Sequence, residues 1–209
     1  MAQPDEKGKG EVFNYLGVVT SIILGLGIGR LLTGCARLIQ ARDFIPFSAL
    51  YVWWLVLLFP LYVTYWWTFW DFRIQARWTF LSFFFLVSGP IALYLITVLL
   101  LPDFNAYEQQ VVFKPIEHYT NIRNWFFGLF AMLQVWGILL SPCLKTGFKQ
   151  SSFLDSYKYA QYMLLAALIV GTLSSPSAKS MLVLDSSILV IFWFVLLYLL
   201  SVHRPTLSE

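Results

Sequence analysis

Six apolar runs separated by polar stretches divide the chain. A helix that crosses a bilayer needs about 20 predominantly apolar residues, and in lipid its backbone groups must be satisfied within the segment. These runs therefore predict an all-α fold, a polytopic integral membrane protein with a bundle of six transmembrane helices. The predicted helices cover residues 14–39, 47–70, 78–101, 124–144, 158–175 and 180–202.

The polar segments between and outside these runs predict the topology. We expect a flexible polar tail at 1–13, an extramembrane loop at 102–122 and a C-terminal tail at 203–209. The first apolar run is too long for the core of a signal peptide, so we expect a membrane helix and no cleaved leader. Six helices put both termini on one side, where Lys and Arg are more numerous, and this favours cytoplasmic termini in a bacterial inner (plasma) membrane.

The composition agrees with a membrane-embedded protein and argues against several classes of function. The chain of 209 residues is 59% hydrophobic and 12% charged, whereas soluble domains are about 25% charged. A net charge of +3 is too small and too dispersed for a nucleic-acid-binding surface. The two cysteines stand apart, and no catalytic or phosphate-binding motif occurs. We therefore expect no enzyme activity, metal, cofactor or nucleic-acid partner.

Arg30 lies just past the middle of the first apolar run. An arginine at that depth costs about 2.5–3.5 kcal/mol on insertion scales, so it normally faces a protein interior or a hydrated cavity and has a partner. Gly27 and Gly34 share its helix face and would leave room for the guanidinium. Arg37, on the same face near the helix end, can reach the membrane interface.

Asp185 is the expected counter-ion of Arg30. The first and sixth helices of a six-helix chain run antiparallel, so both residues fall in the same leaflet. Ser186 adds a hydroxyl next to this site, and Gln134 is a weaker candidate contact in the fourth run. Three outcomes stay open: a structural ion pair, an ion or substrate site, or two residues that never meet.

Small residues recur at every fourth position of the first run and form a ridge along one face. Such ridges let another helix approach closely. We therefore expect the first helix to be central, against a neighbouring helix or its own copy in an oligomer. The ridge consists of Gly17, Ser21, Gly25, Gly29 and Thr33.

A weak internal similarity relates the two halves of the chain. Residues 31–37 read LLTGCAR and residues 139–145 read LLSPCLK, each at the end of the first helix of a three-helix half. Two such halves would form a 3+3 inverted repeat, as in many transporters. A match of seven residues is also short enough to arise by chance.

Three functions follow from these patterns. The leading expectation is a channel or transporter-like protein for a small ion or solute, using an intramembrane Arg/Asp site. The first alternative is a non-catalytic membrane subunit or scaffold that associates with partner proteins. The second alternative is a lipid-binding protein or lipid-directed enzyme, in which Arg30 and Arg37 receive a phosphate head group. Besides the lipid bilayer, the expected partner is a further copy of the chain or another membrane protein.

Overall fold

Every regular element that the structure describes is a helix. The computed structural model describes residues 4–71, 79–101, 113–143, 162, 164–171, 173 and 178–202. Residues 164–171 are helical, and the expected all-α class is confirmed for the described residues. The five longer helices are α1 (Pro4–Gln40), α2 (Ala49–Asp71), α3 (Phe80–Leu100), α4 (Pro115–Cys143) and α6 (Ala178–Val202).

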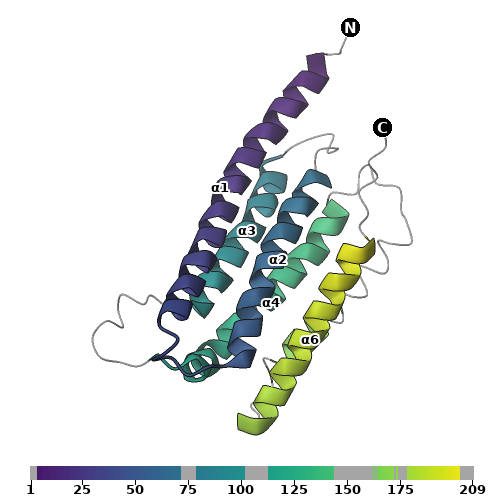
Figure 1. Ribbon diagram of the computed structural model, residues 1–209. Helices are drawn as coiled ribbons and strands as arrows, with labels where there is room; N and C mark the ends of the chain where they lie inside the picture. Colours follow the sequence, from purple (N-terminus) through teal and green to yellow (C-terminus); the bar gives the residue numbers. More distant parts are fainter. Residues whose placement is uncertain are drawn as a thin grey trace.

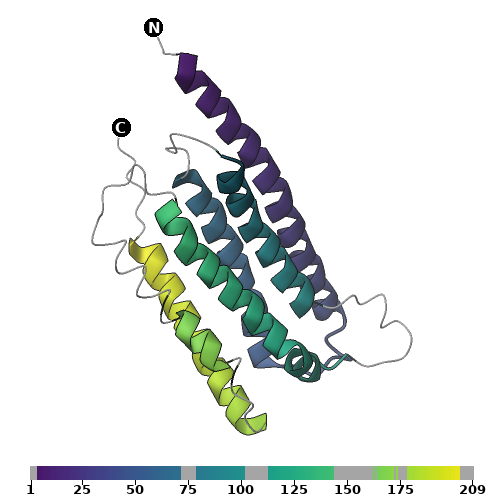
Figure 2. The same ribbon diagram turned by 180° about the vertical axis from the view of Figure 1, so that it is seen from behind.

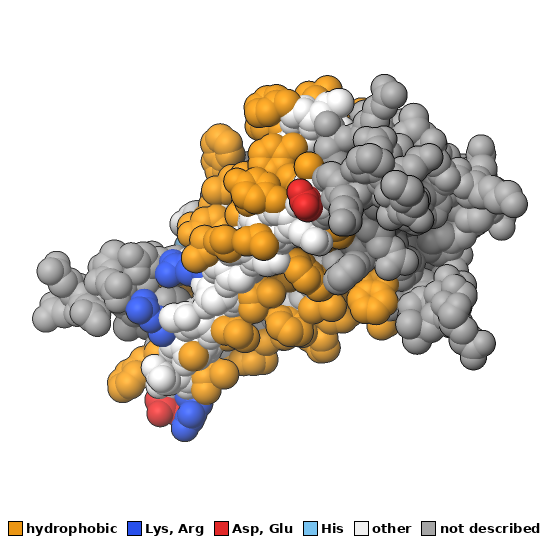
Figure 3. All heavy atoms as spheres, turned by 90° about the horizontal axis from the view of Figure 1, so that it is seen from above, with side chains coloured by type: hydrophobic (Ala, Val, Ile, Leu, Met, Phe, Trp, Pro, Cys, Tyr) orange, Lys and Arg blue, Asp and Glu red, His pale blue; other side chains and the backbone are white. Residues whose placement is uncertain are grey.

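Four of these helices are long and apolar enough to cross a membrane. The qualifying segments are Glu11–Gln40, Ala49–Trp67, Phe80–Leu100 and Pro115–Leu139, and α6 contributes a shorter apolar stretch, Met181–Leu197. Seen from above, much of the described surface is hydrophobic, and the few charged side chains lie scattered over it (Figure 3).

The bundle is arranged around α2. Helix α2 contacts α1, α3, α4 and α6, whereas α1 packs on α2 and α3 at one side of the bundle. Within the described bundle the first helix therefore lies at one side and packs on α2 and α3, whereas the expected contact of its ridge with another copy stays a prediction. Helix α1 begins and α6 ends at the same end of the molecule (Figures 1 and 2), which is the arrangement that an even number of antiparallel helices gives.

Two helices begin earlier than the polarity of their residues predicted. Helix α1 begins at Pro4, so most of the expected flexible tail is helical, and α4 begins at Pro115 within the expected loop. Proline is favoured at the first position of a helix, where its missing N–H costs nothing. Glu117 in the first turn of α4 also suits the positive end of the helix dipole.

Some expectations fall on residues outside the described ranges. These are the remainder of the loop at 102–112, both ends of the predicted fifth helix, the tail at 203–209 and the last two residues of the suggested repeat. The inverted repeat and the six-span count therefore stay predictions.

The core of the bundle is rich in aromatic rings. Trp54 of α2 is completely buried, and its ring centroid lies 5.0 Å from Phe126, 5.8 Å from Phe130 and 6.0 Å from Phe192. Two of these contacts, those with Phe126 and Phe192, have the edge-to-face geometry that aromatic quadrupoles favour. These contacts join α2, α4 and α6 beside the site described below.

Pro90 interrupts the hydrogen-bond ladder of α3, and neighbouring helices compensate. Because proline has no N–H, the carbonyl of Leu86 loses its helical donor. The Tyr65 hydroxyl donates to that carbonyl, and the Trp136 indole donates to the carbonyl of Phe85 at 2.7 Å. Gly89 allows both rings this close, since a Cβ there would lie 2.5 Å from Tyr65 and 2.8 Å from Trp136. Such compensation is how proline is tolerated inside membrane helices.

Candidate functional site: a buried arginine–aspartate pair

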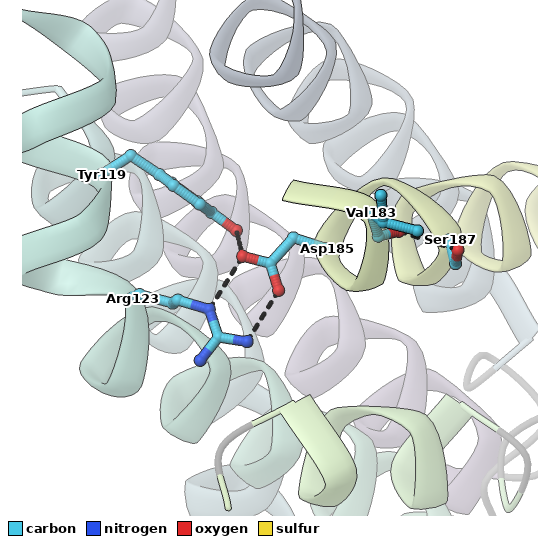
Figure 4. A network of polar contacts seen from close by, with 5 residues as sticks. All are labelled: Tyr119, Arg123, Val183, Asp185 and Ser187. Carbon is cyan, nitrogen blue, oxygen red and sulfur yellow. Dashed lines mark hydrogen bonds and ion pairs between the residues drawn. The ribbon is translucent and has the colours of Figure 1, made fainter. Parts of the chain in front are cut away.

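A buried ion pair joins α4 to α6. Arg123 donates from Nη2 to Oδ1 of Asp185 at 2.7 Å and from Nε to Oδ2 at 2.8 Å, the two parallel bonds of a bidentate pair. The Tyr119 hydroxyl donates to the same Oδ2 at 3.1 Å. The side chains of Arg123 and Asp185 are 5% and 0% exposed. Figure 4 shows the three side chains converging between the two helices.

Local helix geometry aligns the donors. Tyr119, Arg123 and Phe127 follow one another at intervals of four residues in α4, so they share one face. The guanidinium carbon of Arg123 lies 5.1 Å from the centre of the Phe127 ring, within range of a cation–π contact. Asp185 meets this face from the second turn of α6. One face of α4 thus supplies both donors and a ring for the cation.

The surroundings of the pair make it a strong interaction that depends on both partners. Both side chains are buried, and in a medium of low dielectric an ion pair is attracted more strongly while an unpaired charge is very costly. Both carboxylate oxygens of Asp185 already accept hydrogen bonds. The described geometry is therefore that of a closed, neutral network that locks two helices together.

Arg30 is not the partner of Asp185, and the predicted Arg30–Asp185 pair is wrong. Arg30 donates from Nη2 to the carbonyl of Leu101 at 3.1 Å. The physical reason is helix order, since α1 packs on α2 and α3, while α6 packs on α2. Even a shared leaflet would not bring two residues together when other helices separate them.

Arg30 instead belongs to a group of three side chains that cap the C-terminal end of α3. The Tyr51 hydroxyl donates to the carbonyl of Leu100 at 2.6 Å, and Nε2 of His118 lies 3.1 Å from the carbonyl of Leu99. Since a carbonyl can only accept, His118 carries its proton on Nε2. The last carbonyls of a helix lack intrahelical donors and carry partial negative charge. Side chains of α1, α2 and α4 satisfy them here.

The other predicted site residues lie apart from the pair. Gly27 and Gly34 are buried, but Tyr62 and Leu101 fill the space beside them. Arg37 is half-buried near the end of α1. Ser186 points outward on α6, and Gln134, half-buried in α4, lies about 16 Å along the helix from Arg123 at 1.5 Å per residue.

The small-residue ridge of α1 is covered only at its first part. Gly17 lies against the ring of Phe69, with 3.4 Å between that ring and a Cβ built on the glycine. At Gly25 and Gly29 a Cβ would meet nothing within 4 Å, and Thr33 is exposed. The middle and the end of the ridge therefore face outward from the bundle.

Arg123 is the residue that sequence reasoning missed. The predicted fourth helix begins at residue 124, so Arg123 fell outside every predicted span, because the stretch before residue 124 is polar. Two signals could have placed it in a helix: proline at position 115 followed by Glu117, and the spacing of Tyr119, Arg123 and Phe127.

No protein-family model matches this chain, and no curated protein and no solved structure matches it either. Within the described ranges, no group of three or more His, Cys, Asp or Glu side chains is arranged to hold a metal ion. The function must therefore be argued from the geometry of the bundle itself.

Replacing Arg30 by Gln is expected to lower the free energy of unfolding by about 1–2 kcal/mol, because the cap on Leu101 is a hydrogen bond from a charged group. The half-buried position of Arg30 puts the effect near the lower end of the range for such bonds. Equilibrium unfolding in detergent measures it. Arg42→Gln is the matched control, since Arg42 is exposed and its contact with the exposed Asp43 is long, at 3.8 Å. An equal effect of the two variants would contradict the capping role.

Proposed function

We propose that this chain is a multi-pass membrane protein that acts as a non-catalytic subunit or scaffold and associates with another membrane protein through α1. The proposal includes six membrane-spanning helices, with both termini on the cytoplasmic side of a bacterial inner membrane. The length and hydropathy of four described helices and the excess of Lys and Arg on the side of the termini support this topology.

The observation that carries the proposal is a contrast in exposure: the charged pair is buried inside the bundle, whereas small residues of α1 face outward. The Asp185 carboxylate is 0% exposed and both of its oxygens accept hydrogen bonds, from Arg123 and Tyr119, so this pair holds helices and is not exposed to a ligand. Gly25 and Gly29 instead face outward with open space beside them. In lipid, helices associate by close packing of small residues, because burial of apolar surface gives no advantage there.

The flanks of this outward face suit a second helix. The large side chains of Ile22, Leu26 and Leu32 are exposed on α1 and would border the groove left by the glycines. A helix laid along Gly25, Gly29 and Thr33 could bring its backbone close to that of α1, as in small-xxx-small packing.

The double variant Gly25→Leu/Gly29→Leu tests the proposal. The variant is expected to fold with unchanged thermal stability, because both Cβ positions are open, but to lose association. Complex size is measured in mild detergent by light scattering and native electrophoresis, with mass spectrometry of co-purified proteins. Gly128→Leu is the matched control, since this glycine of α4 is exposed and has nothing within 4 Å. Unchanged complexes in the double variant, or a wild-type protein that stays a monomer alone in membranes, would refute the association.

Passage of a small ion or solute is the second candidate function. Its support is the Arg123–Asp185 pair itself, because ionisable side chains within membrane helices often mark transport pathways. Flux in liposomes that contain only the purified wild-type protein would favour transport over the subunit role. Absence of flux for protons and common ions, with a partner recovered from membranes, would favour the subunit role.

A further inference from the structure

The connection between α1 and α2 holds two phenylalanines away from the bundle. Phe44 is 78% exposed and Phe47 is 83% exposed, among the highest values for the large hydrophobic side chains that the structure describes; Phe80 at 82% and Leu173 at 80% lie in the same range. They flank Ile45, which packs against the hydrophobic core. An exposed phenylalanine in water forgoes the gain of apolar burial. Two of them beside a partly buried anchor call for an apolar surface outside the described chain.

The backbone of this connection is ordered. The N–H groups of Phe44 and Ile45 both donate to the carbonyl of Ala41, at 2.9 and 3.1 Å, and that of Ala41 donates to the carbonyl of Arg37 at 2.9 Å. The N–H of Val52 donates to the carbonyl of Ser48 at 3.1 Å and starts α2. Backbone hydrogen bonds thus hold the turn on both sides of Phe47, and both rings are exposed on it.

The place of this turn in the chain indicates what covers the rings. It joins the apolar segments Glu11–Gln40 and Ala49–Trp67, each long enough to cross a membrane. A connection of this length between two membrane helices must lie at the boundary of the bilayer. Arg42 and Asp43, beside Phe44, have side chains 72% and 76% exposed, as expected where the chain also meets water and lipid head groups.

We infer that Phe44 and Phe47 insert into the interfacial layer of the lipid bilayer, with Arg42 and Asp43 at its aqueous edge, so that this turn anchors one end of the bundle at a defined depth. The occupant is phospholipid: acyl chains and glycerol around the rings, and a phosphate within reach of the Arg42 guanidinium. The inference rests on the membrane embedding in the proposed function. It goes further by assigning a lipid-contacting surface to an extramembrane turn.

Spin labels at single cysteines test this inference in phospholipid nanodiscs. Labels are placed on the full chain, with Cys35 and Cys143 replaced by Ser, at Phe44→Cys, Phe47→Cys and Asp43→Cys. Oxygen concentrates in lipid, whereas a nickel chelate stays in water. The ratio of collision with oxygen to collision with nickel is expected to be severalfold higher at positions 44 and 47 than at position 43. A label at Met132→Cys, 52% exposed in the middle of α4, gives the value for the bilayer interior.

The Met132 label separates the two ways in which the experiment can fail. Ratios at 44 and 47 as low as at 43, with a high ratio at 132, would overturn the anchor and leave the membrane embedding intact. A low ratio at 132 as well would overturn the embedding on which the proposed function depends. Protection of 44 and 47 from both oxygen and nickel would show that protein covers them, and this also overturns the lipid contact.

Discussion

Replacing Asp185 by Ala is expected to destabilise the bundle by about 3–5 kcal/mol, the usual cost of removing one partner of a buried ion pair. The variant leaves the Arg123 guanidinium with its side chain 5% exposed and without the carboxylate that balances its charge. It also removes the acceptor of the Tyr119 hydroxyl, which is fully buried. The unfolding free energy in detergent, from titration with a denaturing surfactant, measures the loss.

A second variant separates the energetic penalty of an unpaired buried charge from the net contribution of the ion pair to the free energy of unfolding. Replacing both partners, Arg123→Met with Asp185→Leu, is expected to recover most of the loss, because a packed apolar pair is often as stable as a buried ion pair. Ser187→Ala is the control on the same helix, since its hydroxyl is exposed and bonds only to the carbonyl of Val183. If Asp185→Ala stays within about 1 kcal/mol of the wild type, water reaches the pair and the site is not closed.

The helical architecture was predictable because long apolar runs are a strong signal that depends on local sequence alone. For α2 and α3, the predicted ranges 47–70 and 78–101 agree within two residues with the observed Ala49–Asp71 and Phe80–Leu100. The start of α4 was harder to predict from the sequence, because His118 and its polar neighbours resemble a loop.

The partner of Asp185 was not predictable, because it depends on which helices are neighbours. Several arginines lie at suitable depth in a bundle of antiparallel helices, and the chain order does not say which one faces α6. The rings at the start of α2 show the same limit. Trp53 and Trp54 are adjacent aromatic residues of the same apolar run, yet Trp54 is buried in the core and Trp53 is 53% exposed. Adjacent residues on a helix point in different directions, and only packing decides which of them faces inward.

Gly27 and Gly25 lie two residues apart on α1, and their substitution is expected to have opposite consequences. A Cβ at Gly27 would lie 2.6 Å from the ring of Tyr62, closer than side chains tolerate. Tyr62 is fully buried, and its hydroxyl is hydrogen-bonded to that of Thr97 at 2.8 Å. Gly27→Ala must displace this ring and break that bond, so we expect a net loss of about 1–3 kcal/mol, the usual cost of overpacking a core.

Gly25→Ala is the matched control, because a Cβ there meets nothing within 4 Å. Alanine favours a helix over glycine by about 1 kcal/mol, so this variant is expected to be as stable as the wild type or slightly more stable. The same titration in detergent compares the two. Equal stability of both variants would mean that α1 does not pack on Tyr62 as described. Gly27 therefore reports on packing inside the bundle, whereas Gly25, whose neighbouring space is open, reports on contacts with other chains.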